Sequence, residues 1–236
     1  MSNLGAVWRE FFDFLRNPRL PDERIPFGRQ AAQQVGVLLL LDWAVVICFV
    51  IFALALESGG IELPQEIEED WTPGEMFLFI VVLAPPLEEL IFRVGLSGQR
   101  RALTMFVAPW LLVAALIGAR FLIGPLDMRT VLVLSVGWLV STIAVVACHW
   151  NDRSLLHGFR RLFPYAFWLT SGLFGLMHIF NYEDPMSLAV LLMVIPQFTG
   201  GMMLGYVRVK YGMWSNIAQH VAHNAVFLAL YYAWPG

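Results

Sequence analysis

The apolar run at residues 76–96 contains the charged stretch Pro85-Pro86-Leu87-Glu88-Glu89-Leu90-Ile91-Phe92-Arg93. An ionisable side chain near the centre of a membrane helix costs about 2.5–3.5 kcal/mol, so this cluster needs a physical reason. Glu89 and Arg93 are four residues apart and can form an ion pair along one helix face. Glu88 then points about 100° away and is left to meet another helix. Because prolines lack the amide hydrogen, the two prolines should disturb the helix just before Glu88.

The rest of the chain has the composition of an integral membrane protein. Its 236 residues are 58% hydrophobic and 14% charged, whereas soluble domains carry about 25% charged residues. Seven apolar runs are long enough to span a bilayer; they lie at about 34–56, 76–96, 104–124, 130–149, 164–181, 186–207 and 212–234. We therefore expect an all-α fold, a polytopic membrane helix bundle with about seven transmembrane helices.

The connections between these runs alternate in charge. The first 30 residues contain five arginines, whereas segment 57–75 contains seven acidic residues and no Lys or Arg. Basic connections follow at Arg100–Arg101, at residues 153–161 and at Arg208–Lys210, and those between them are acidic or mixed. Because cytoplasmic loops carry the excess of Lys and Arg, the N-terminus is predicted to be cytoplasmic and the C-terminus external. The compactness of the chain suggests a bacterial inner membrane.

Residues 1–30 are predicted to be a cytoplasmic or interfacial segment, and residues 31–236 a single transmembrane domain. Trp8, Phe11, Phe12 and Leu15 recur at helical spacing and predict an amphipathic helix. That helix either lies in the membrane interface or packs on the rest of the protein. The aromatic residues Tyr231, Tyr232 and Trp234 at the end of the chain are typical of a membrane-boundary belt.

Further polar residues lie in the fifth and seventh runs, where Phe174 is followed by His178, and His220 by Asn224. Counted from the basic connections at 1.5 Å per residue, Glu88, His178, His220 and Asn224 all lie roughly 15–21 Å from the cytoplasmic boundary. Their shared depth on three helices predicts one polar site. His223 faces a different direction from His220 and is expected either to pack between helices or to support the residues that form the site.

The residue types at this site favour the hydrolysis of an amide. A buried carboxylate can act as general base for water, a histidine can share that water, and His220 with Asn224 can support an oxyanion. Two histidines and one glutamate also match a catalytic zinc site with an open position. The His-Glu-x-x-His zinc signature is absent from the sequence, which favours a reaction without a cofactor and leaves zinc open.

These residues resemble the motifs of the CAAX-protease and bacteriocin-processing family, the Abi family of intramembrane proteases. Its Glu-Glu-x-x-x-Arg motif is similar to Glu88, Glu89 and Arg93, its Phe-x-x-x-His motif to Phe174 and His178, and its His-x-x-x-Asn motif to His220 and Asn224. The motif-bearing part spans about 76–230. Between Arg93 and His178 lie 84 residues (94–177), enough for two extra spans at about 104–149 that the family pattern lacks.

The resemblance implies an intramembrane endopeptidase. Glu88 and His178 would activate water, His220 and Asn224 would support the oxyanion, and Glu89, Arg93 and Phe174 would support the site. A zinc ion, if one is used, would be held by Glu88, His178 and His220. The implied partners are a peptide or lipid-modified protein tail and membrane lipids, without nucleic acid; the oligomeric state is open.

Two other functional classes share these features. A proton-coupled transporter also carries Glu, Arg and His at the membrane midplane, but no repeat halves are visible here. A non-catalytic immunity or scaffold protein of the same family would have no need to retain all four of Glu88, His178, His220 and Asn224.

Overall fold

The computed structural model describes the whole chain except residues 1–3, 68–69, 125–126, 149–150, 153 and 234–236, so the predicted belt residue Trp234 lies outside the described part. The fold is all-α, as predicted. Its elements are α1 (Leu4–Arg16), α2 (Arg29–Ser58), α3 (Pro73–Met76), the π-helix η1 (Phe77–Leu83), α4 (Ala84–Phe92), the 3-10 helix η2 (Val94–Ser97), α5 (Arg100–Ile123), α6 (Met128–Cys148), α7 (Phe159–Met177), the 3-10 helix η3 (His178–Asn181), α8 (Leu188–Met193), α9 (Ile195–Lys210) and α10 (Met213–Ala233).

Among the described residues, five helical segments are long and apolar enough to cross a membrane: Arg29–Ser58, Arg100–Ile123, Arg129–Cys148, Phe159–Asn181 and Leu188–Lys210. The other two predicted runs are helical as well. One is divided into α3, η1 and α4, and the polar residues of α10 lower the hydropathy of the other. Length and composition thus establish five candidate spans rather than the predicted seven.

The predicted disturbance before Glu88 is confirmed. The helix that begins at Pro73 widens into the π-helix η1 and returns to α-helical geometry at Ala84. Within η1 the amide of Ala84 bonds to the carbonyl of Phe79, five residues back. The carbonyl of Ile80 would need the amide of Pro85 in the same pattern, and proline has none. Pro85 therefore leaves the carbonyl of Ile80 without a backbone donor.

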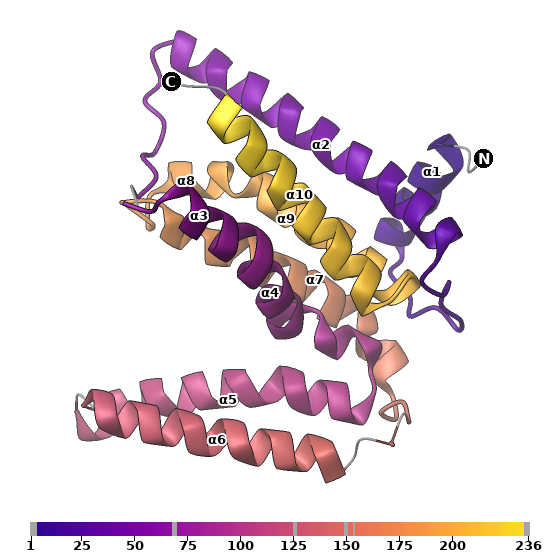
Figure 1. Cartoon of the computed structure of the whole chain (residues 1–236), viewed down its shortest axis with the longest axis vertical. Coiled ribbons are helices and arrows are strands. Elements are labelled where there is room, and N and C mark those ends of the chain that lie inside the picture. Colours follow the sequence, from indigo (N-terminus) through magenta and orange to yellow (C-terminus); the bar gives the residue numbers. More distant parts are fainter. Residues whose placement is uncertain (1–3, 68–69, 125–126, 149–150, 153, 234–236) are drawn as a thin grey trace.

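The charge alternation along the sequence corresponds to a separation in space. α1 and the last described residues of α10 lie at opposite ends of the bundle (Figure 1). Glu66 and Tyr182 form an antiparallel bridge that joins two acidic connections, and Gln99 and Leu155 form one that joins two basic connections. At the acidic end, burial and the Glu66 carboxylate raise the pKa of Tyr182 to about 12. Connections of like charge are thus gathered at the same end.

α1 packs against the bundle, which confirms the second of the two predicted placements. Val7 and Phe11 are buried, Phe14 meets aromatic rings of α7 and α9, and Trp8 donates to a backbone carbonyl of α2 at 3.0 Å. Phe12 was expected on the buried face and is 46% exposed. The apolar face therefore follows Val7, Phe11 and Phe14, because α1 lies in a corner between α2, α7 and α9.

The two extra helices, α5 and α6, form a hairpin beside the main bundle (Figure 1). α5 meets α4 through an edge-on contact of Phe92 with Trp110, with ring centroids 5.9 Å apart. It approaches η2 so closely at Gly95 that a Cβ there would lie 2.8 Å from the ring of Phe106. The hairpin is thus attached to the segment that directly follows Glu88 and Glu89.

Small residues, Gly201 and Gly205, bring α7 and α9 together. A Cβ at Gly205 would lie 2.9 Å from the ring of Phe167, and one at Gly201 would lie 3.1 Å from the ring of Phe174. Larger residues would separate these helices, because α9 presses directly on aromatic rings of α7.

Candidate active site

Glu89 and Arg93 form a fully buried ion pair at the end of α4, which confirms the predicted pairing. Nη1 of Arg93 donates to Oε1 of Glu89 at 3.0 Å, and the two side chains are at most 1% exposed. α10 contributes two further donors: Nδ1 of His220 donates to Oε1 at 2.8 Å, and the amide of Asn216 donates to Oε2. Glu89 therefore has partners on both oxygens.

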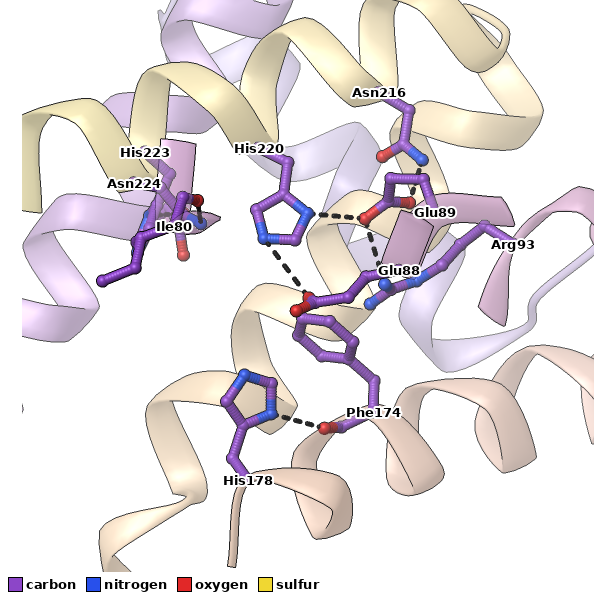
Figure 2. A network of polar contacts seen from close by, with 11 residues as sticks. Ile80, Glu88, Glu89, Arg93, Phe174, His178, Asn216, His220, His223 and Asn224 are labelled. Carbon is purple, nitrogen blue, oxygen red and sulfur yellow. Dashed lines mark hydrogen bonds and ion pairs between the residues drawn. The ribbon is translucent and has the colours of Figure 1, made fainter. Parts of the chain in front are cut away.

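Glu88 points to another side of α4 and has fewer partners. Its Oε2 lies 3.7 Å from Nε2 of His220, which is longer than a hydrogen bond. The same oxygen is buried and has no hydrogen-bond partner among the described residues. His220 lies between the two carboxylates and turns one ring nitrogen toward each (Figure 2). Glu88 thus keeps an acceptor that the protein itself does not use.

The ring of Phe174 connects the side chains of three helices. The guanidinium carbon of Arg93 lies 3.7 Å from its centroid, within the range of a cation–π contact. The rings of His178 and His220 meet it edge-on, with centroids 4.9 and 5.8 Å away. Phe174 therefore fixes the positions of α4 and α10 relative to the end of α7.

His178 caps the C-terminal end of α7. Its Nδ1 donates at 2.7 Å to the carbonyl of Phe174, one of the carbonyls that a helix end leaves without a partner. Because a carbonyl only accepts, Nδ1 carries the hydrogen, and Nε2 of the neutral ring is an acceptor. The imidazole extends from α7 toward Glu88 (Figure 2). The cap thus sets both the direction and the tautomer of this ring.

Asn224 is placed differently from the sequence-based expectation. It lies one turn beyond His220 on α10, but its amide donates at 2.8 Å to the carbonyl of Ile80 in η1. Figure 2 shows Asn224 and Ile80 to one side of the cluster around Glu88. This is the carbonyl that Pro85 leaves without a backbone donor. Asn224 therefore satisfies the π-helix, and one of its two N–H groups remains for other contacts.

The proposed zinc ligands are not arranged as a metal site. In the described part of the chain, no group of three His, Cys, Asp or Glu side chains could hold a metal ion. Glu88, His178 and His220 therefore do not form a ready three-ligand set.

Comparison with known families agrees with the motifs. A model of the type II CAAX prenyl endopeptidase Rce1-like family matches residues 70–226, more than half of the chain. The chain belongs to this family. No curated protein and no solved structure matches the chain. The matched region contains all three motifs, so the resemblance inferred from them is confirmed, and CAAX-type endopeptidase activity is the activity of the family.

The sequence reasoning missed two residues that contact the motifs or their helix. Asn216 bonds to Glu89 and stands four residues before His220, so the repeat Asn216, His220, Asn224 along one face of α10 was a usable signal. Asp42 bonds to His223 at 2.6 Å. Its signal was a lone carboxylate within the apolar run 34–56, outside the region that the Rce1-like family model matches.

Arg208 was counted with the basic connections, but it is 5% exposed within α9. Its guanidinium donates to the carbonyls of Arg93 and Val94, at 3.1 and 3.4 Å. These carbonyls lie where α4 ends, so Arg208 compensates for the negative end of that helix. This buried arginine thus supports the segment that presents the Glu-Glu-x-x-x-Arg motif.

Proposed function

We propose that the protein is an intramembrane endopeptidase in which Glu88 activates the attacking water. The observation that carries this proposal is the difference between the two adjacent carboxylates. Glu89 is saturated by Arg93, His220 and Asn216, whereas Oε2 of Glu88 is buried without a hydrogen-bond partner among the described residues. A carboxylate with an open acceptor beside two imidazoles is suited to general-base catalysis.

His178 assists by orienting the water. With its hydrogen on Nδ1, the ring can accept a hydrogen bond at Nε2, so a water between Glu88 and His178 finds two acceptors. Glu88 takes one proton as the water oxygen attacks the carbonyl carbon of the scissile peptide bond. The proton then passes from Glu88 to the leaving nitrogen as the C–N bond breaks, which leaves a carboxylic acid, carrying the second proton of the water, and an amine.

His220 and Asn224 are proposed to support the negative oxygen of the tetrahedral intermediate. His220 offers Nε2, which donates only when the ring carries both hydrogens, because Nδ1–H is used by Glu89. Asn224 offers the N–H that its bond to Ile80 leaves free. Each donor of this type contributes about 2.7–4 kcal/mol of transition-state stabilisation in known hydrolases.

The proposed substrate is a peptide or lipid-modified protein tail that reaches the site from the bilayer or the cytoplasmic face. The family description, which names a prenyl endopeptidase, supports a prenylated tail. The charge alternation supports seven spans with the N-terminus cytoplasmic and the C-terminus external. The compactness of the chain supports a bacterial inner membrane. The reaction as proposed needs no metal ion.

The test is cleavage of membrane-anchored CAAX-type peptides, prenylated and unprenylated, by purified protein in liposomes. We expect the wild type to cleave and Glu88→Gln to lose activity by about 10²-fold or more while its melting temperature stays unchanged. Glu57→Gln, at an exposed carboxylate, is the matched control and should cleave normally.

A chelator added to the same assay tests the absence of a metal requirement, and activity should persist. Normal cleavage by Glu88→Gln would overturn the assignment of the base, and chelator-sensitive cleavage would overturn the metal-free reaction. If the wild type cleaves no member of a diverse anchored peptide library, the transporter and scaffold alternatives replace the proposal.

A further inference from the structure

A second polar pair joins α10 to α2, away from the three motifs. Nδ1 of His223 donates at 2.6 Å to Oδ2 of Asp42, which is 3% exposed. The ring of His223 is also stacked on the indole of Trp43, with centroids 5.0 Å apart and planes at 23°. Two consecutive residues of α2 therefore contact the imidazole of His223: Asp42 binds its edge, and Trp43 stacks on its face.

This pair restrains the rotation of α10 about its axis. One face of α10 presents Asn216, His220 and Asn224 to α4 and η1, and His223 leaves the helix on the side of α2. A rotation of about 20° would move a side-chain tip that lies roughly 6 Å from the helix axis by about 2 Å. Such a rotation would disturb the hydrogen bond of His223 with Asp42 and its ring contact with Trp43. The contact with α2 is thus a restraint on α10 in addition to the bonds that Asn216, His220 and Asn224 make to α4 and η1.

Simple packing does not account for Asp42. A carboxylate inside a membrane helix is costly, and apolar residues of similar volume would join α2 to α10 at least as stably. Its second oxygen, Oδ1, is buried and has no hydrogen-bond partner among the described residues. It lies where α9 has Gly200, at which a Cβ would be 3.6 Å away. A directional bond to His223 is what aspartate provides here and an apolar residue does not.

We propose that Asp42 and His223 are positioning residues for peptide hydrolysis, which set the rotation of α10 and through it the approach of His220 to Glu88. The kinetic part of this inference rests on the proposed function, and the geometric part does not. Asp42 lies outside the family-matched region 70–226, so the first long helix contributes to a site whose motifs lie elsewhere.

The test compares three full-length variants in liposomes. Asp42→Leu removes the hydrogen bond to His223, whereas Asp42→Asn keeps an acceptor for Nδ1–H of His223. The control is Gln34→Leu, which removes a different hydrogen bond of α2, the one that Gln34 accepts from Tyr211 at 3.0 Å. We expect Asp42→Leu to lower kcat about tenfold or more with KM within about twofold, because misplacement by about 1 Å has effects of this size. Asp42→Asn and Gln34→Leu should stay within about threefold of the wild type.

A second readout needs no activity. In protein labelled with ¹⁵N-histidine, His220→Gln identifies the His220 resonances, and Asp42→Leu should shift them whereas Gln34→Leu should not. The proposal is overturned if Asp42→Leu leaves both kcat and the His220 resonances unchanged, or if Gln34→Leu lowers kcat equally. An equal loss in Asp42→Asn would overturn it as well, because the charge and not the hydrogen bond would then matter. If the wild type has no activity, the resonances alone decide the geometric part.

Discussion

Adjacent residues of one helix take different roles here because they point about 100° apart. Glu89 is directed into the contact with α10 and Arg93, where both of its oxygens accept hydrogen bonds. Glu88 is directed to the edge of that contact and is 20% exposed, with His220 beyond hydrogen-bond distance. At the scale of residues, one glutamate thus holds the helices together, and the other remains available for chemistry.

The buried pair leads to a prediction about folding. Arg93→Met leaves the buried carboxylate of Glu89 without its cationic partner, and breaking a buried pair in this way costs about 3–5 kcal/mol. The folded yield and the melting temperature of Arg93→Met should both fall. The double variant Glu89→Gln/Arg93→Met removes both charges at once and should recover most of the loss in a thermal unfolding assay. A double variant as unstable as Arg93→Met would show that the ion pair is not the source of the effect.

At the scale of elements, the π-helix η1 explains the placement of Asn224. Its register pairs the amide of Ala84 with Phe79 and leaves the carbonyl of Ile80 facing a proline nitrogen. An unsatisfied backbone group in a membrane costs several kcal/mol, so a side chain from another helix has to supply the donor. Asn224 does so at 2.8 Å. The prolines that distort the first motif helix are therefore linked to the last residue of the third motif.

This link predicts that substitutions at Pro85 and Asn224 are not additive. Asn224→Leu should destabilise the protein by about 1–3 kcal/mol, because the carbonyl of Ile80 loses its donor. Pro85→Ala supplies a backbone amide at the position where the π-helix lacks one. In the Pro85→Ala background, Asn224→Leu should lower the free energy of unfolding by less than half as much as it does in the wild type. The measurement is unfolding of both single variants and of the double variant. Additive effects would show that Asn224 does not serve the carbonyl.

The features predicted from the sequence were those set within one helix. The four-residue spacing predicted the pairing of Glu89 with Arg93, and the two prolines predicted the helix distortion before Glu88. The shared depth placed Glu88 and His220 at one site, but the individual bonds between distant helices could not be predicted, because spacing gives the face of a helix and not what lies opposite it. Asp42 was visible as a carboxylate in an apolar run, but its partner is 181 residues away.

At the scale of the whole molecule, the structure arranges the connections into two ends with opposite charge. The bridge of Glu66 with Tyr182 belongs to the acidic end, and the bridge of Gln99 with Leu155 to the basic end. The N-terminal arm also lies at the basic end, because the amide of Ile25 donates a hydrogen bond to the carbonyl of Lys210 at 2.9 Å. Since α1 and the last described residues of α10 lie at opposite ends (Figure 1), the chain passes between the two ends an odd number of times, whichever end faces the cytoplasm.

This arrangement predicts the result of labelling from each side of the membrane. In a background with Cys48 and Cys148 replaced by serine, single cysteines at Asp22 and Ser154 should react with an impermeant maleimide only after the cytoplasmic face is opened. Single cysteines at Glu62 and Asp184 should react in intact cells. These four exposed positions lie in four different connections, two at each end. If the cysteines at positions 22 and 62 were labelled from the same side, α2 would not cross the membrane. Labelling of all four positions with reversed sidedness would keep the seven spans and place the C-terminus in the cytoplasm, against the positive-inside rule.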